Sequence, residues 1–118
     1  MRQALAIDTV GRGGFRVAGL WRPGSLMILD DIARDWPPTR LAELTAADFA
    51  AVIAAPPGAV ELVLLGTGPA QALPPREVRE ALRAAGLGLE FMATEAAARL
   101  YNVLASEGRR VATALIAV

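Results

Sequence analysis

Apolar residues in the second half of the chain alternate between two spacings. Residues 60–65 form an almost continuous apolar run, which is typical of a strand buried on both faces. Val78, Leu82 and Ala85 then recur at helical spacing. Strands are predicted near 60–65, 88–92 and 110–117, and helices near 46–54, 75–85 and 95–107. Because strands joined by helices of this length run parallel with right-handed crossovers, the pattern predicts an α/β domain with these three strands in one sheet.

Polar and glycine residues mark the ends of the predicted helices. Thr45 precedes the first helix, where its hydroxyl can accept the backbone N–H of Asp48. Thr94 is expected to cap the third helix in the same way. Gly86 and Gly108 supply left-handed stops after the second and third helices.

The first 40 residues carry short β-type runs. Strands are expected near 5–7, 15–17 and 25–29, separated by turn signals at 11–14 and 22–24. They either add a hairpin to the main sheet or form a small second sheet. Residues 30–40 contain Trp36-Pro37-Pro38 and are expected to form an ordered loop.

The composition excludes several classes of chemistry. The 118 residues are expected to form a single α/β domain, spanning 1–118. The sequence has no cysteine, histidine or lysine, which removes thiolate metal sites, the histidine general base and Schiff-base chemistry. This composition favours a protein that is not an enzyme and that holds neither a cofactor nor a metal.

Charge and hydropathy restrict the partners. Twelve arginines balance twelve acidic residues, so no long-range attraction to nucleic acid is expected. No run approaches the ~20 apolar residues of a membrane span, and Asp8 interrupts the N-terminus before a signal-peptide core. We expect a cytoplasmic protein, a monomer or weak homo-oligomer, that can dock on a membrane complex without being inserted in one.

The Gly66-Thr67-Gly68 turn follows the predicted strand at 60–65 and admits three interpretations. It resembles part of a dinucleotide-binding motif, with Glu90 at the distance of a ribose-binding acid. Against this, Gln71 replaces the third glycine and Pro69 removes a backbone amide. The other interpretations are a tight turn at a strand end and a pocket for a small anion or polar ligand.

The third predicted helix carries a polar face. At intervals of i, i+4, i+7 and i+11, this face presents Glu95, Arg99, Asn102 and Ser106. It is either solvated, with a Glu95–Arg99 pair worth about 0.3 kcal/mol, or it turns Arg99 and Asn102 toward the Gly66 turn. In the second case the amides at the helix start also point there. The candidate ligand site then consists of Gly66, Thr67, Gly68, Thr94, Arg99 and Asn102.

Two further groups of residues have simple structural explanations. Asp30, Asp31 and Asp35 lack a calcium-loop signature, so a solvated acidic turn is expected. Trp21 and Trp36 serve either as lids over the sheet or as exposed anchors for a partner.

Three motifs of the second half have a fixed register. They are the Gly66-Thr67-Gly68 turn, Met92-x-Thr94, and Arg99-x-Tyr101-Asn102-x-Leu104-x-x-Glu107-Gly108-Arg109-Arg110-Val111. With Gly24-Ser25 and Trp36, they resemble a family of small single-domain proteins. That family contains a mitochondrial assembly factor of respiratory complex I and many bacterial proteins labelled as domains of unknown function. The resemblance covers nearly the whole chain. It implies a three-layer α/β domain with a mixed, largely parallel central sheet, and action through protein partners.

Two functions of different classes follow. The first is a non-catalytic protein-interaction module that assists assembly of a membrane-associated, respiratory-type complex. The second is a small-molecule or anion-binding domain with its site at the C-terminal edge of the strands, where open α/β sheets place ligands. A closed, packed strand edge favours the first function, and an open polar pocket favours the second.

Overall fold

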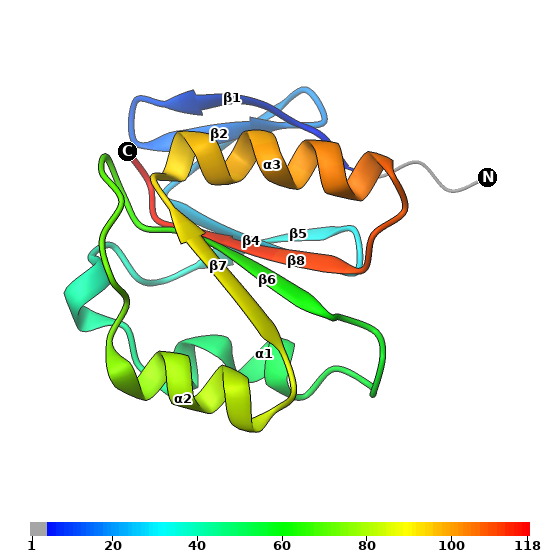
Figure 1. The fold of residues 1–118 in the computed structure, drawn as a ribbon. Coiled ribbons are helices and arrows are strands. Elements are labelled where there is room, and N and C mark those ends of the chain that lie inside the picture. Colours follow the sequence, from blue (N-terminus) through cyan, green and yellow to red (C-terminus); the bar gives the residue numbers. More distant parts are fainter. Residues whose placement is uncertain (1–4) are drawn as a thin grey trace.

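A computed structural model describes residues 5–118, which form two sheets and three α-helices (Figure 1). The expectation that no signal peptide is present rests partly on residues 1–4, which lie outside the described residues. The strands are β1 (Ile7–Gly11), β2 (Gly14–Val17), β3 (Leu20–Pro23), β4 (Ser25–Leu29), β5 (Ile32–Trp36), β6 (Leu62–Gly66), β7 (Gly88–Met92) and β8 (Val111–Leu115). The α-helices are α1 (Ala50–Ile53), α2 (Arg76–Ala84) and α3 (Thr94–Ser106), and the 3-10 helices are η1 (Leu41–Glu43) and η2 (Ala46–Phe49).

The larger sheet has five strands in the order β5-β4-β8-β6-β7. β6 runs parallel to both β7 and β8, which confirms that the three strands predicted in the second half share one sheet. β4 runs antiparallel to β8 and to β5, so the sheet is mixed, with two parallel and two antiparallel pairs, and the expectation of a largely parallel sheet is wrong. The chain thus adds the β4–β5 hairpin to the main sheet and also forms a second sheet, in the order β1-β2-β3.

Two strands of the structure depart from the sequence prediction. The segment 30–40, expected to be a loop, contains β5, and β3 precedes Gly24 where only a turn was expected. Both strands follow two-residue turns, Ala18-Gly19 and Asp30-Asp31, in which both residues have positive φ. Tight hairpins require this conformation, and its usual signal is Asn-Gly or Asp-Gly. In this chain the two turns are Ala-Gly and Asp-Asp, so the usual sequence signal for a tight hairpin is missing.

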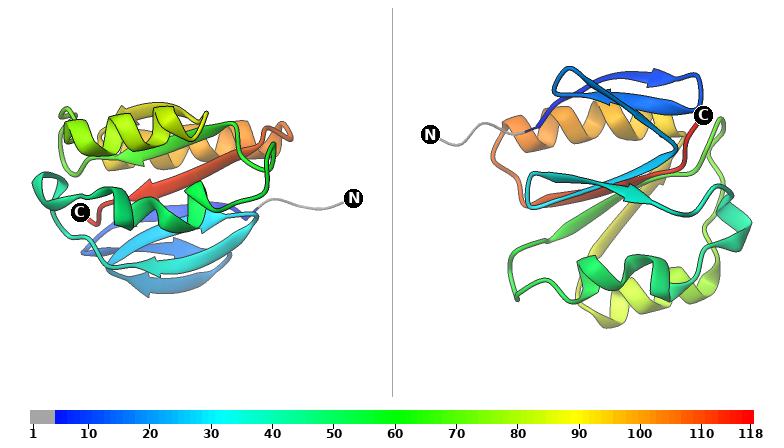
Figure 2. Two further views of the ribbon diagram at one scale, coloured as in Figure 1. Left: turned by 90° about the horizontal axis from the view of Figure 1, so that it is seen from below. Right: turned by 180° about the vertical axis from the view of Figure 1, so that it is seen from behind.

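The five-stranded sheet packs on both faces (Figures 1 and 2). α1 and α2 cover one face, where Phe49, Val63 and Leu82 are fully buried. α3 and the small sheet cover the other face, where Phe15, Leu64 and Ala97 are fully buried. The three-layer description implied by the resemblance stays a prediction, because one face is covered by a helix and a second sheet together.

The first predicted helix is present as η2 followed by α1. Thr45 and Asp48 form a capping box at its start, in which the backbone N–H of Thr45 also donates to the Asp48 carboxylate at 2.8 Å. Trp36, at the end of β5, is buried and lies edge-on to Phe49 with 5.5 Å between ring centroids. Its indole N–H donates to the carbonyl of Asp48 at 2.9 Å. Trp36 is therefore buried against the sheet and is not an exposed anchor, whereas Trp21 is 45% exposed.

Candidate functional site

The Gly66 turn and the start of α3 meet at the C-terminal edge of β6 and β7. The backbone N–H of Thr94 donates to the carbonyl of Gly68 at 2.8 Å. The Thr94 hydroxyl accepts the N–H of Gly68 at 3.0 Å and donates to the carbonyl of Ile116 at 2.7 Å. One fully buried side chain thus joins the turn after β6, the start of α3 and the segment after β8.

The expected capping role of Thr94 is wrong. Thr94 is the first residue of α3, and Ala93 occupies the N-cap position without a side-chain hydrogen bond. The reason is burial: a hydroxyl inside the fold must find partners, and the nearest ones belong to Gly68 and Ile116 rather than to the helix.

The other residues of the turn are also packed and bonded. Thr67 is buried; its backbone N–H donates to the carbonyl of Met92 at 2.8 Å, and its hydroxyl donates to the carbonyl of Ala70 at 2.7 Å. A Cβ added to Gly66 would lie 2.9 Å from the Cα of Thr94, so only glycine fits there. The strand edge is therefore closed by the protein's own groups.

Asn102 has a structural partner instead of the Gly66 turn. Its side-chain amide donates to the carbonyl of Ile7 at 2.8 Å and its side-chain oxygen accepts the N–H of Ile7 at 2.9 Å. The expectation that Asn102 turns toward the Gly66 turn is wrong. The physical reason is that β1 is an edge strand of the small sheet, and the Asn102 amide satisfies backbone groups that a neighbouring strand would otherwise pair.

Arg99 lies on the exposed side of α3, where its guanidinium is 3.8 Å from the Glu95 carboxylate. With Asp8, Thr9 and Asn102 it lines a hollow of about 320 Å³ between β1 and α3. The structure thus divides the predicted set: Gly66, Thr67, Gly68 and Thr94 meet at the strand edge, and Arg99 and Asn102 lie along β1. The ligand-binding role of these residues stays a prediction.

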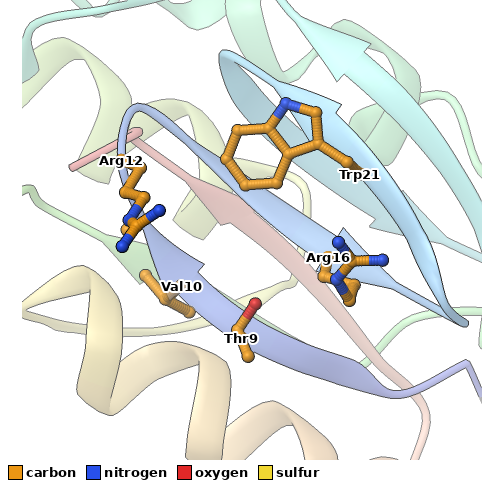
Figure 3. Close-up of a pocket in the computed structure, with 6 residues that line it drawn as sticks. Thr9, Val10, Arg12, Arg16 and Trp21 are labelled. Atoms are coloured by element: carbon orange, nitrogen blue, oxygen red, sulfur yellow. The ribbon is translucent and has the colours of Figure 1, made fainter.

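A second hollow, of about 460 Å³, lies on the outer face of the small sheet (Figure 3). It is lined by Thr9, Val10, Gly11, Arg12, Arg16 and Trp21. Thr9 pairs with Arg16 across β1 and β2, and Arg16 pairs with Trp21 across β2 and β3. The three side chains therefore form one row across the sheet. Sequence reasoning missed this group because β3, which carries Trp21, was not predicted as a strand.

Within residues 5–118, no three acidic side chains gather closely enough to hold a metal ion. Burial, and then the negative charge of Asp31, raise the pKa of Tyr101 to about 12. This tyrosine belongs to the core beneath α3. No helix among residues 5–118 is long and apolar enough to cross a membrane.

The fold and the closed strand edge define a class of protein, a small mixed α/β domain with two sheets. In this class the C-terminal edge of the parallel strands, which usually holds ligands in open α/β sheets, is filled by the protein's own residues. The chain belongs to the DUF498/DUF598 family of proteins of unknown function, whose sequence profile matches residues 7–116.

Relatives and solved structures agree with this assignment. An uncharacterized protein of Rhodobacter capsulatus is 42% identical over 113 residues, covering 96% of this chain and 85% of the relative. A crystal structure described as an outer membrane protein from Bartonella henselae is 33% identical, with a TM-score of 0.90, and the match covers 98% of this chain and 96% of that one. An NMR structure of a Rhodopseudomonas palustris protein is 40% identical, with a TM-score of 0.81 and coverage of 96% and 83%.

Proposed function

We propose that this protein is a non-catalytic protein-interaction module. The observation that carries the proposal is the closed strand edge, where the Thr94 hydroxyl binds both Gly68 and Ile116. A ligand at this edge would have to break buried hydrogen bonds and displace packed backbone, at a cost of about 1–3 kcal/mol for each polar group left unpaired. The alternative, a small-molecule or anion site at the same edge, is disfavoured for that reason.

We further infer that the module assists assembly of a membrane-associated, respiratory-type complex, and that it works in the cytoplasm. The resemblance of Arg99-x-Tyr101-Asn102 and the following residues to the complex I assembly factor supports this role. Docking rather than insertion is supported by the absence of a membrane-spanning helix within residues 5–118.

The proposal is tested by mild cross-linking of the tagged full chain in cells of its source organism, followed by affinity capture and mass spectrometry. A tagged unrelated protein of similar size is the control. The expected result is specific enrichment of subunits of one membrane complex. The proposal is overturned if no protein is enriched over the control and native mass spectrometry of the purified chain shows a bound small molecule instead.

A further inference from the structure

The outer face of the small sheet combines an exposed aromatic ring with two guanidinium groups. Thr9, Arg12, Arg16 and Trp21 make up what we call the arginine–tryptophan face; Figure 3 shows Trp21 between the two arginines. We propose that this face is the docking surface for an extended, acidic segment of a protein partner. The inference rests on the proposed function and names the chemistry of its partner.

The two arginines of this face are not held in ion pairs within residues 5–118. Elsewhere in the described part of the chain, acidic side chains bind arginines: Asp35 binds Arg22 at 3.1 Å and Glu61 binds Arg110 at 2.7 Å. Within residues 5–118, neither Arg12 nor Arg16 forms such an ion pair. Two unpaired guanidinium groups beside one ring attract carboxylates, with which arginine makes paired hydrogen bonds.

Arg16 and the ring of Trp21 are held in place by the backbone. Arg16 donates from its guanidinium to the carbonyl of Gly19 at 2.8 Å. Trp21 lies over Gly14, where an added Cβ would approach the ring to 3.0 Å and the Arg22 carbonyl to 2.4 Å. Glycine at position 14 thus lets the indole lie close to the sheet. A fixed, half-exposed tryptophan next to arginine has the composition of binding hot spots in protein interfaces.

The shape of the surface favours an extended segment over a small ion. The hollow over the small sheet shares Thr9 and Val10 with the hollow between β1 and α3, so the two depressions adjoin along β1. A free anion would occupy only the arginine end of this surface. An anionic lipid surface would also meet the second hollow, where the carboxylates of Asp8 and Glu95 outnumber the one guanidinium group of Arg99, so this part of the surface does not attract its headgroups. A peptide can place its carboxylates at the arginines and its other residues along β1.

The test is an NMR titration of the full chain with a short blocked peptide in which glutamates flank a phenylalanine. The chain has two tryptophans, so the indole N–H signal of exposed Trp21 reports binding and that of buried Trp36 is an internal control. We expect a saturable shift of the Trp21 signal alone. Arg12→Gln should raise the dissociation constant about tenfold, because a charge-assisted contact is lost. Arg83→Gln, in the last turn of α2 on the other side of the main sheet, should leave it unchanged.

Four outcomes would overturn the inference. They are an equal shift with the matched glutamine peptide, unchanged affinity in Arg12→Gln, saturation of the same shift by glutarate alone, and retention of the protein on phosphatidylglycerol vesicles but not by the peptide. The first two remove the charge argument. The last two identify a small anion or a membrane as the occupant.

The cross-linking experiment separates this inference from the proposed function. If capture of the membrane complex is lost in the double variant Arg12→Gln/Arg16→Gln but not in Arg83→Gln, both proposals are supported. If the double variant captures the same partner as the unchanged protein, the interaction function stands and the docking surface is wrong.

Discussion

A single hydroxyl group at Thr94 organises the edge of the sheet where a ligand was expected. Its two partners, the N–H of Gly68 and the carbonyl of Ile116, belong to segments that follow different strands. Because Thr94 is fully buried, no water can replace these bonds when the hydroxyl is removed. The residue that sequence reasoning placed in a ligand site is therefore a structural link between three segments.

Removing this hydroxyl should destabilise the protein more than the loss of an exposed helix cap would. We expect Thr94→Val, which keeps the size of the side chain, to lower the free energy of unfolding by about 2–4 kcal/mol, since two buried groups lose their partner. Thr94→Ser keeps both bonds and should cost about 1 kcal/mol or less. Urea unfolding measures both values, and Thr45→Ala at an exposed position is the control. Equal losses in Thr94→Val and Thr94→Ser would show that the methyl group contributes as much as the hydroxyl, which contradicts the dominant role given to the two hydrogen bonds.

Tyr101 makes stability depend on pH in the alkaline range. Burial and the charge of Asp31 raise its pKa from 10 to about 12, so between these values the folded state keeps a proton that the unfolded chain releases. The folded state is then disfavoured as pH rises. Tyr101 contributes about 2–3 kcal/mol to the free energy of unfolding below pH 10, and this contribution is lost by about pH 12.

The chain suits this measurement because it has one tyrosine and neither lysine nor cysteine. Urea unfolding of the wild-type protein should show a lower free energy of unfolding near pH 11 than near pH 8. Tyr101→Phe should be less stable at pH 8 but should lose much less stability between the two pH values. A phenolate absorbance titration of the folded protein with a midpoint near 10 would contradict the raised pKa.

At the scale of elements, the strands that the sequence predicts and those that it does not predict differ in the segment that precedes each strand. β6, β7 and β8 were predictable because apolar runs lie between helices with clear proline and glycine boundaries. β3 and β5 were missed because their hairpin turns place Ala18 and Asp30 in the left-handed region without the usual asparagine. In β5, moreover, Trp36 precedes two prolines, which suggested a loop although the strand ends just before them.

The turn at Ala18 offers a stabilising substitution. Ala18 has φ of +49° and is exposed, a conformation that alanine adopts at a cost of about 1 kcal/mol and asparagine at less. Ala18→Asn should therefore raise the free energy of unfolding by about 0.5 kcal/mol. Ala72→Asn, at an exposed position outside the left-handed region, is the matched control and should give no gain. A loss of stability in Ala18→Asn would show that the side chain is constrained by contacts and not by the backbone.

At the scale of the whole molecule, residues far apart in sequence hold the small sheet in place. The N–H of Gly13 donates to the carbonyl of Val118 at 2.7 Å, and Asn102 binds Ile7, which lies 95 residues earlier in the chain. This separation explains why only four of the six candidate residues meet where the sequence placed them. Thr94 and Gly68 meet because neighbouring parallel strands end at one edge, whereas the face of α3 that meets β1 follows from packing of a sheet whose place the sequence did not reveal.

Asn102 should therefore control the attachment of the small sheet. Asn102→Ala leaves the N–H and carbonyl of the buried residue Ile7 without their partner, so we expect the free energy of unfolding to fall by about 2 kcal/mol. Asn102→Asp should lose nearly as much at neutral pH, because a carboxylate can accept the N–H of Ile7 but repels its carbonyl. Ser106→Ala is the control, since Ser106 is exposed and bonds only within its own helix.

Hydrogen exchange locates the effect of these variants. In Asn102→Ala the amide of Ile7 should exchange much faster than in the wild-type protein. Amides in β8, the central strand of the main sheet, should exchange only through global unfolding. Selective release of β1 would mean that the floor of the arginine–tryptophan face depends on a side chain of α3. Equal effects of Asn102→Ala and Ser106→Ala on stability and on exchange at Ile7 would show instead that the small sheet is held by its apolar packing against Leu26 and Ile28.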